Sequence, residues 1–519
     1  MLFASGRALR YTDRGPITDR QSEGRERKTS MRTGSCIGGE WYHPRGERLI
    51  RNVNPADTAD VIAEFPAATA ADTARAIDAA QAAFGAWRDT PAPERGRVLW
   101  RAADLARQRA EEIAQLMTRE QGKILREARG EVVKGINVLE YNAGEGFRLG
   151  GETLPSEIAD TFTYTLRRPL GVVGLITPWN FPWAIPCWKM APELVAGNTV
   201  VFKPAALTPG CAALLLEILA EAGLPEGVVN MVVGAGSDVG AAIVDDRRVR
   251  AVSFTGSNEV GMALYPRAAA RGAKVTCEMG GKNAVVVMPD ADLAKAATAI
   301  VGGAFGSTGQ RCTATSRVIA LPGIKDELVE RVAAGARQLK VGPGLDESVD
   351  MGPAVDAQQC QTDLDYIAVG RQEGARLVLG GGRPPGLEGG YFVEPTIFDR
   401  VTPAMRIFRE EIFGPVLSIC QAADLDEAIR FANGVEYGLT TSIFTRDVNA
   451  IMRYVEEAEA GMVHVNEPTI GGEAQLPFGG TKATGVGPRE MGEEGVHFYT
   501  ELKTVFINYS GSAERSLIR

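Results

Sequence analysis

The sequence predicts an α/β protein built on parallel sheets, and two stretches of the chain carry this prediction. From 171 to 278, short β-branched segments alternate with helical segments, and from 284 to 445 a second block repeats the alternation. Strands separated by helices at this spacing form parallel, doubly wound sheets. A chain of 519 residues is also too long for one core, so we expect more than one domain.

The first block follows a helical N-terminal region that begins after an extended segment near 37–41. Helices are expected at 70–87, with Thr69 as N-cap, at 94–120 and at 124–141. The expected strands of the block are 171–176, 199–202, 228–233, 251–254 and 275–278, with helices at 185–194, 212–222, 238–244 and 258–271.

The second block also alternates strands with helices. Two further segments, in which apolar and polar residues alternate, lie outside both blocks. Residues 161–166 and 496–509 alternate as edge strands do, so we expect them to pair as a small two-stranded flap that serves oligomerisation. The expected strands of the second block are 284–288, 317–321, 416–421 and 442–445, with helices at 293–305, 324–339 and 425–433.

Composition excludes several classes of function. The net charge of −9 argues against a nucleic-acid or anionic-membrane partner. The uncharged run 169–188 is interrupted by prolines, which argues against a membrane span. Seven scattered cysteines indicate a reducing, cytoplasmic setting, and no His/Cys cluster has the spacing of a metal site. The first thirty residues lack the features of a secretory or transit signal, and Met31 is an alternative start.

A cysteine in the segment 305–313, FGSTGQRCT, is a candidate nucleophile. Cys312 follows an apolar helical segment and a small, flexible run in which glycines permit close approach of a ligand. A lone cysteine is more often a small buried apolar residue, so this motif needs support from elsewhere. That support comes from the turns after the expected strands, because ligands bind there on parallel sheets.

Two of those turns carry side chains suited to catalysis. Asn180, between prolines in TPWNFP, is a preorganised amide donor of the kind that stabilises an oxyanion, although it could simply cap its own turn. Glu278 ends an apolar strand before a Gly-Gly turn, where a raised pKa would suit a general base. The plainer alternative is a surface glutamate that pairs with Lys282.

Two further turns indicate a phosphate-bearing ligand. In FTGSNEVG, residues 254–261, a strand ends in a glycine turn that opens a helix, a geometry suited to pyrophosphate. Lys203 ends another strand and could meet ribose hydroxyls or a phosphate, although it could also be an ordinary solvated lysine.

Together these residues carry a resemblance to a known family. From about 37 to 509 the chain resembles the NAD(P)-dependent aldehyde dehydrogenase superfamily, and it is most similar in motifs to the α-ketoglutaric and succinic semialdehyde dehydrogenases. The motifs occur in the family's order, as TPWNFP, FKP, FTGSNEVG, CEMGGKN, GQRCTA, EEIFGPV and PFGGTKATG.

The resemblance implies an aldehyde oxidation in which Cys312 attacks as a thiolate and Asn180, with the Cys312 backbone N–H, holds the oxyanion. The thiohemiacetal would pass hydride to NADP or NAD, and Glu278 would activate water to hydrolyse the thioester. Lys203 and Glu490 complete the implied catalytic set, Glu490 as a proton relay. The implied cofactor contacts are Ile176, Thr177, Pro178, Trp179, Asn180, Lys203, Ala206, Gly236, Gly240, Phe254, Thr255, Gly256, Ser257, Val260, Glu278, Met279, Gly280, Cys312, Glu411 and Phe413.

The domain organisation follows from the same resemblance. It implies a Rossmann-like dinucleotide-binding domain at 35–149 and 169–280, a catalytic domain at 281–485, an oligomerisation arm at 150–168 and 496–510, and a disordered extension at 1–34. We expect a homodimer or homotetramer in the cytoplasm.

One departure from the family concerns the cofactor. Many NAD-preferring members have an acid three residues after the lysine, where this chain has Ala206. Without that carboxylate a 2′-phosphate is not repelled and could pair with Lys203, so we predict that NADP is accepted, with NAD possible.

The substrate prediction is a semialdehyde, because Arg311 is adjacent to the nucleophile and could bind an acid group. The alternative is that Arg311 pairs with a structural carboxylate, which would favour uncharged aliphatic or aromatic aldehydes. The expected substrate-lining residues are Phe181, Trp183, Trp188, Arg311, Thr313 and Phe478.

Other classes of function fit less well. A cysteine hydrolase needs a histidine base, and none of the three histidines belongs to a Cys–His signature. A CoA-acylating dehydrogenase would not need Glu278 as water activator. A catalytically silent binding or structural protein would not need both Cys312 and Glu278.

Overall fold

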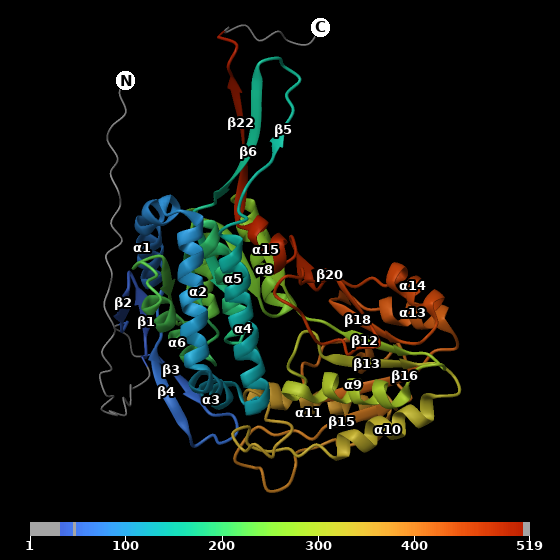
Figure 1. The fold of residues 1–519 in the computed structure, drawn as a ribbon. Helices are drawn as coiled ribbons and strands as arrows, with labels where there is room; N and C mark the ends of the chain where they lie inside the picture. The colour runs from blue at the N-terminus through green and yellow to red at the C-terminus, as the bar shows by residue number, and fades with distance from the viewer. Residues whose placement is uncertain (1–31, 45–47, 512–519) are drawn as a thin grey trace, which may run out of the picture. The chain divides into compact units, whose positions relative to one another are not determined.

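Two parallel-stranded sheets organise the computed structural model, which describes residues 32–44 and 48–511 (Figure 1). The predicted α/β class is confirmed, since strands and helices alternate along both sheets. The extension predicted at 1–34 lies, as far as residue 31, outside the described residues. The domain boundaries given above remain a prediction.

The first sheet is parallel in its centre and antiparallel at its edges. All residues of its two middle strands, VVGLI and TVVFK, are buried, as expected where helices cover both faces. In spatial order its strands are β2 (Glu40–Tyr42), β1 (Ser35–Ile37), β9 (Val229–Met231), β8 (Thr199–Lys203), β7 (Val172–Ile176), β10 (Val249–Thr255), β11 (Lys274–Glu278) and β21 (Gly485–Val486). A separate hairpin joins β3 (Leu49–Val53) to β4 (Val61–Pro66).

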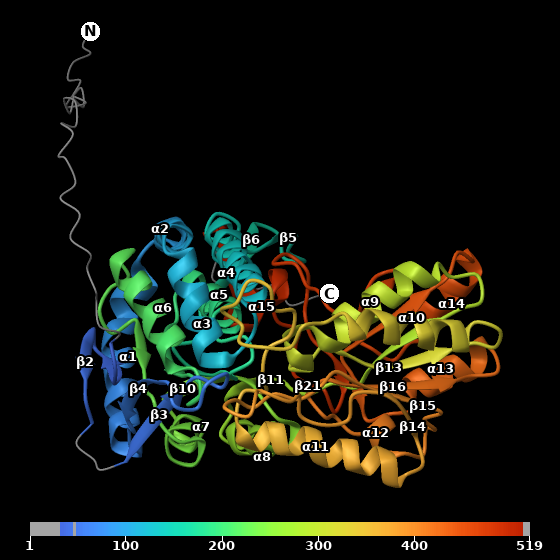
Figure 2. The same ribbon diagram turned by 90° about the horizontal axis from the view of Figure 1, so that it is seen from below.

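Helices pack on both faces of this sheet. The core of one face combines residues of the sheet with residues of α1 (Ala70–Asp89), α7 (Ala241–Asp245) and α8 (Asn258–Ala270). Thr69 caps α1 through a reciprocal pair of hydrogen bonds with Asp72, as predicted for this N-cap. Figure 2 shows the other face covered by α2 (Ala92–Gln108), α4 (Leu125–Glu145), α5 (Ala184–Ala196) and α6 (Pro209–Glu221).

One predicted helix is wrong, because the expected helix 94–120 is two helices. The chain leaves helical geometry at Arg109 (φ −101°, ψ 16°), so α2 ends at Gln108 and α3 runs from Ala110 to Gln121. The Arg109 guanidinium binds the carboxylates of Glu112 and Glu217, which fixes the corner. No glycine or proline occurs at 109, so the sequence carries no local sign of this break.

The second sheet repeats the parallel arrangement, with one antiparallel strand at its edge. Its strands in order are β14 (Arg376–Leu379), β15 (Thr396–Asp399), β16 (Val416–Gln421), β13 (Thr315–Ala320), β12 (Asn283–Val287), β18 (Thr440–Phe444) and β19 (Met462–Val465). Figure 1 shows α9 (Leu293–Phe305) and α10 (Lys325–Arg337) on one face and α13 (Leu425–Asn433) and α14 (Val448–Glu457) on the other.

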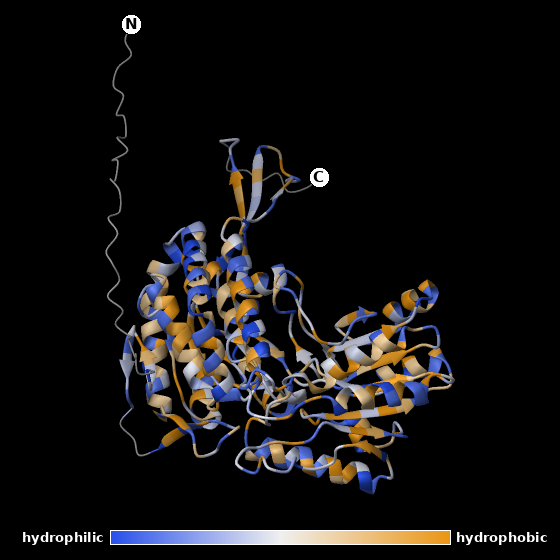
Figure 3. Ribbon diagram, turned by 60° about the horizontal axis from the view of Figure 1, so that its bottom comes forward, coloured by the Kyte–Doolittle hydropathy of each residue, from blue (hydrophilic) through white to orange (hydrophobic). Residues whose placement is uncertain are grey.

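Both cores consist of apolar residues of the sheets and of the inward faces of the helices. Figure 3 shows hydrophobic residues concentrated on the central strands of the two sheets and hydrophilic residues along the outer helices. The face of the second sheet that carries α13 and α14 is also covered by α11 (Ala357–Gln372) and α12 (Arg406–Arg409). A short two-stranded ladder joins β17 (Tyr437–Gly438) to β20 (Thr481–Lys482).

The predicted flap forms, but it has three strands instead of two. β22 (Thr500–Asn508) pairs along its whole length with β6 (Thr161–Pro169), and β6 also pairs with β5 (Thr153–Leu154). The first residues of the segment predicted as strand belong to α15 (Gly492–Phe498), since Val496 and Phe498 are buried on a helix. The flap extends away from both sheets (Figure 1).

Within 32–44 and 48–511, no helix is long and apolar enough to cross a membrane. The same residues contain no group of histidine, cysteine and acidic side chains that could hold a metal ion.

Candidate active site

The segment before the predicted nucleophile has an unusual backbone that one carboxylate holds in place. After α9 the chain passes through Ser307, Thr308 and Gly309, whose φ angles are 50°, 59° and 70°. Left-handed φ is unfavourable for residues with a Cβ, so such a segment persists only where its surroundings hold it. Glu127 on α4 does so, because its Oε1 accepts hydrogen bonds from the Ser307 backbone N–H at 2.7 Å and from Arg311 Nη2 at 2.9 Å.

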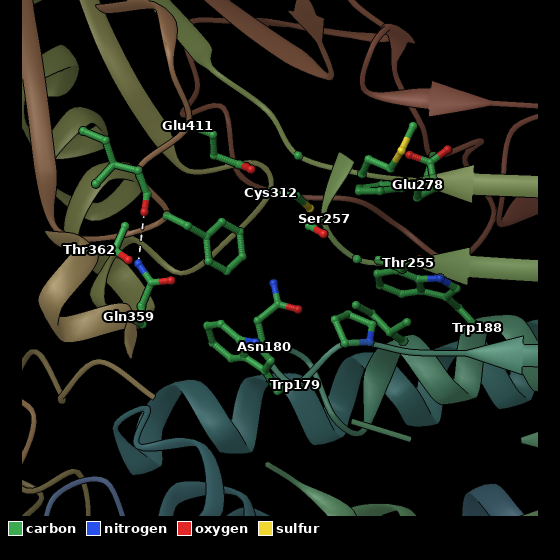
Figure 4. Close-up of a pocket in the computed structure, with 18 residues that line it drawn as sticks. Trp179, Asn180, Trp188, Thr255, Ser257, Glu278, Cys312, Gln359, Thr362 and Glu411 are labelled. Atoms are coloured by element: carbon green, nitrogen blue, oxygen red, sulfur yellow. Dashed lines mark hydrogen bonds between the residues drawn. The ribbon is translucent and has the colours of Figure 1, made fainter. Parts of the chain in front are cut away.

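Cys312 follows this segment and borders a cavity of about 320 Å³ (Figure 4). Burial, together with the nearby Glu278 and Glu411 carboxyls, raises the pKa of its thiol to about 12, against the opposing effect of the Lys134 ammonium. The other six cysteines are also free but buried. Cys312 is therefore the partly exposed member of the seven, and it lines this cavity.

Asn180 lies in the turn between β7 and α5, and its amide is fixed from two sides. Its Nδ2 donates a hydrogen bond to the Gln310 carbonyl at 3.1 Å, two residues before the cysteine. Its backbone carbonyl accepts a hydrogen bond from Lys123 Nζ at 2.7 Å. The side chain is buried, so a fixed amide donor lines the same cavity as Cys312.

Glu278 ends β11 and also borders this cavity. Burial raises the pKa of its carboxyl well above the ordinary value, and the Glu490 carboxylate adds to the shift. Its Oε2 has no hydrogen-bond partner among the described residues. The alternative pairing with Lys282 is not observed: the Lys282 ammonium is buried beside Arg317, and burial lowers its pKa to about 7.

Glu490 lies outside the cavity, in a buried polar cluster behind it. Its carboxylate accepts hydrogen bonds from Trp188 Nε1 at 2.9 Å and Ser253 Oγ at 3.1 Å, and it forms an ion pair with Lys189. Lys189 also donates to Ser253 at 2.7 Å. Because the charges of Glu490 and Lys189 both act on Glu278, the cluster influences the proton affinity of that carboxyl.

A second cavity, of about 590 Å³, lies at the ends of β7, β8 and β10 and shares lining residues with the first. Lys203 borders it with no ion-pair partner among the described residues, and burial lowers the pKa of its ammonium to about 8. The N-terminus of α8 faces the same space, with Ser257 as its N-cap. A buried cation and a helix N-terminus suit a phosphate-bearing ligand such as a dinucleotide.

The structure brings most of the predicted site residues to these two adjoining cavities. The cavity at Cys312 is lined by Pro178, Trp179, Asn180, Trp188, Thr255, Gly256, Ser257, Glu278, Met279, Gly280, Cys312, Glu411, Phe413 and Phe478. The second cavity is lined by Ile176, Thr177, Lys203, Gly236, Gly240, Phe254 and Val260, with several of the first group.

Some residues predicted to contact the substrate or cofactor do not line these two cavities. Arg311 does not line the cavity, because its guanidinium pairs with Glu127, which is the alternative considered for it. Trp183 is fully buried in the core, and Phe181 lies under the Lys123 ammonium. Thr313, which is buried, and Ala206 likewise line neither cavity.

Several residues at the site had no signal in the sequence. Gln359 and Thr362 line the cavity from α11, a helix that the sequence analysis did not predict (Figure 4). Glu127 and Lys189 lie on predicted helices, but their roles depend on contacts more than fifty residues away along the chain. Glu127 and Lys189 belong to no capping or turn motif, so no local sequence signal indicates their roles.

Comparison with known proteins identifies the family. The sequence profile described as "Aldehyde dehydrogenase family" matches residues 41–505. The chain belongs to the aldehyde dehydrogenase family. It is therefore an oxidoreductase, as predicted, and the predicted aldehyde chemistry is confirmed at the level of the family.

Similar proteins cover almost all of this aldehyde dehydrogenase. A 2,5-dioxopentanoate dehydrogenase from Saccharolobus solfataricus is 48% identical over 92% of this chain and 99% of its own length. An α-ketoglutaric semialdehyde dehydrogenase from Bacillus subtilis is 47% identical over 91% of this chain and 97% of its own. Among solved structures, betaine aldehyde dehydrogenase from Staphylococcus aureus in complex with NAD+ has a TM-score of 0.90 at 34% identity, over 93% and 96% of the two chains.

Proposed function

We propose that this enzyme oxidises a semialdehyde to the corresponding carboxylic acid, with NADP or NAD as hydride acceptor. The observation that carries the proposal is the meeting of Cys312, Asn180 and Glu278, from three remote segments, around one cavity. The similar proteins from S. solfataricus and B. subtilis are named for such substrates, which supports the choice of substrate class.

The first half of the reaction forms a bond between Cys312 and the substrate. The sulfur releases its proton to solvent water and attacks the aldehyde carbon as a thiolate, and the carbonyl oxygen becomes an oxyanion as the C=O π bond breaks. Asn180 Nδ2, held beside the cysteine, donates a hydrogen bond to that oxygen together with the Cys312 backbone N–H. Bound NADP or NAD supplies the acceptor for the hydride that leaves the substrate carbon. Loss of this hydride leaves a thioester on the sulfur.

The second half releases the acid. Glu278 takes a proton from a water molecule, whose oxygen attacks the thioester carbon, and the carbon–sulfur bond breaks to restore the cysteine. The unpartnered Oε2 of Glu278 suits this role, because a base must have a free oxygen directed at water. Glu490 and Lys189 adjust the proton affinity of Glu278 from behind and could carry its proton onward.

The second cavity suits the dinucleotide. Lys203 and the N-terminus of α8 would hold its phosphates or ribose, while Trp179, Glu411 and Phe413 would meet the nicotinamide end in the cavity at Cys312. The rings of Trp179 and Phe413 meet edge to face with centroids 5.5 Å apart. With alanine at 206 and no described carboxylate paired with Lys203, we propose that a 2′-phosphate is accepted.

We also propose a homodimer or homotetramer in the cytoplasm. The flap of β5, β6 and β22 exposes Phe162, Leu502 and Phe506, each about half exposed or more, as expected of a surface that another subunit covers. The setting follows from the seven cysteines, all of them free.

The test is a spectrophotometric assay of reduced dinucleotide, with semialdehydes and uncharged aldehydes, and with NADP and NAD in parallel. We expect turnover with the unmodified protein and none with Cys312→Ala, whereas Cys211→Ala, a change at a buried cysteine outside both cavities, should leave turnover intact. Turnover that survives in Cys312→Ala would exclude the mechanism. No activity of the unmodified protein with any aldehyde would favour a catalytically silent member, and a strong preference for NAD would contradict the NADP prediction.

A further inference from the structure

Lys134 on α4 places an ammonium group at the aromatic wall of the cavity that Cys312 borders. Its Nζ lies 5.0 Å from the centre of the Trp188 ring and 5.9 Å from the centre of the Phe478 ring. Both rings line the cavity, and their centroids are 5.5 Å apart. A Cβ at Gly472 would lie 3.4 Å from the same Nζ, so a loop from the C-terminal part of the chain packs against the ammonium.

This ammonium has no anionic partner in the part of the chain that the structure describes. The nearest acid on its own helix, Glu131, is already engaged in a buried ion pair with Lys123 at 2.5 Å. The other acid on this side of the cavity, Glu127, holds Arg311. Burial lowers the pKa of the Lys134 ammonium, as expected for a cation that is partly removed from water without a counter-charge.

The charges that act on Lys134 come from Cys312 and from two residues outside the cavity lining. The Cys312 sulfur and the Glu131 carboxylate favour its charged form, and the Arg311 guanidinium opposes it. The Trp188 and Phe478 rings that the ammonium faces line the same cavity as Cys312, so a substrate bound at the sulfur extends toward Lys134. A partly buried cation without a counter-charge is stabilised when a bound ligand supplies an anion to it.

We propose that Lys134 binds the carboxylate of the aldehyde substrate and thereby selects aldehydes whose far end carries an acid group. The inference rests on the proposed function and names the specificity-determining contact that Arg311 does not provide. Trp188 and Phe478 would contact the carbon chain of the substrate, while the ammonium between them and the loop at Gly472 would meet its carboxylate.

Lys134 could instead act only on the nucleophile, since its charge lowers the pKa of the Cys312 thiol. The two roles differ in which substrates they affect. Loss of an effect on the sulfur would slow every aldehyde to the same extent and would lower kcat. Loss of a carboxylate contact would raise KM for acidic aldehydes and leave uncharged aldehydes unchanged.

The experiment compares 2,5-dioxopentanoate and succinic semialdehyde with pentanal and butanal, in the unmodified enzyme, Lys134→Met and Lys134→Arg. We expect Lys134→Met to lower kcat/KM for the two acids about 10- to 100-fold, mainly through KM, and to leave that for pentanal and butanal within about twofold. Lys134→Arg should retain most of the preference. Lys295→Met, on the exposed face of α9, is the matched control and should change nothing.

Each outcome decides one of the two claims. If the unmodified enzyme oxidises all four aldehydes without preferring the acids, the inference is overturned and the proposed function stands. The same holds if it prefers the acids and this preference survives in Lys134→Met. An equal loss for all four aldehydes in Lys134→Met assigns the residue to the sulfur and overturns the inference as well. Failure of the unmodified enzyme with every aldehyde is the failure of the proposed function. Thermal unfolding of each variant identifies a loss that comes from the fold.

Discussion

At the residue scale, the site is a set of ionisable groups whose charged forms are disfavoured by burial. Desolvation raises the pKa of the Glu411 carboxyl to about 7, and that of Glu278 is also raised well above its usual value. The pKa of the Cys312 thiol is raised mainly for the same reason. Because the thiolate is the nucleophile, the reaction needs groups that stabilise its negative charge.

The carboxyl of Glu278 gives a prediction for hydrolysis. An acid with a raised pKa keeps its proton to higher pH, so the fraction of Glu278 that can accept a proton grows as pH rises through the raised pKa. We expect Glu278→Gln to give one burst of reduced dinucleotide per site, followed by turnover about 10²- to 10⁴-fold slower, with the rise of turnover with pH lost. Stopped-flow absorbance measures the burst and the turnover. Unchanged turnover would assign the water-activating role to another group.

The sequence predicted Cys312, Asn180 and Glu278 because each lies in a turn at the carboxyl end of a strand or next to glycines, where chemistry is commonly placed. It could not predict Lys134, which lies within a long helix where a lysine is normally solvated. Arg311 was predicted to face the substrate because it is adjacent to Cys312 along the chain, but adjacency does not determine which way a side chain points. Its partner, Glu127, is remote in sequence.

At the element scale, the left-handed segment Ser307–Gly309 depends on α4. The Glu127 carboxylate accepts hydrogen bonds from both the Ser307 N–H and the Arg311 guanidinium. These bonds offset the unfavourable energy of a backbone conformation that residues with a Cβ seldom adopt. Adjacent elements that are remote in sequence therefore set the position of the sulfur.

We expect Glu127→Gln to lower the free energy of unfolding by about 1–2 kcal/mol and kcat by roughly tenfold, because a weaker acceptor lets the segment and Cys312 shift. Chemical denaturation and steady-state kinetics with a good substrate measure the two effects. Glu111→Gln, a change in an exposed ion pair with Arg129, is the matched control and should alter neither. A variant with normal kcat would show that the cysteine is held without this carboxylate.

The elements that the sequence predicted are those with strong local patterns. The strands β7, β8 and β12 are buried throughout and mainly apolar, and the expected helices at 293–305 and 425–433 match α9 and α13 to the residue. Several of the elements it missed lack such patterns, although the amphipathic helix α14, also missed, has one. β19, β20 and β21 are only two to four residues long, and α11 mixes polar residues over most of its surface, so tertiary packing decides both.

At the scale of the whole molecule, the flap of β5, β6 and β22 has an apolar surface that the chain itself leaves uncovered. Leu502 and Phe506 are 58% and 59% exposed, and alternation along β22 directs them to the same face. Figure 3 shows this strand as hydrophobic along much of its length. Such a strand in solvent favours association, which is why we expect subunits to cover it.

We expect Leu502→Asp with Phe506→Asp to shift the protein to a smaller species, because two carboxylates would be buried without partners at a subunit interface. Size-exclusion chromatography with light scattering measures the mass. Met452→Asp, at an equally exposed apolar position on α14, should leave the mass unchanged. A protein that is already a monomer before substitution would contradict the predicted role of the flap.

The pairing of β21 with β11 sets the order in which a newly made chain can become active. Gly485 lies opposite Glu278 in that ladder, and Glu490 follows a few residues later. A newly made chain must therefore extend as far as Glu490 before Glu278 acquires these neighbours. Until this segment is made and paired, the proposed base lacks its finished surroundings, so we expect hydrolysis of the thioester to appear only afterwards.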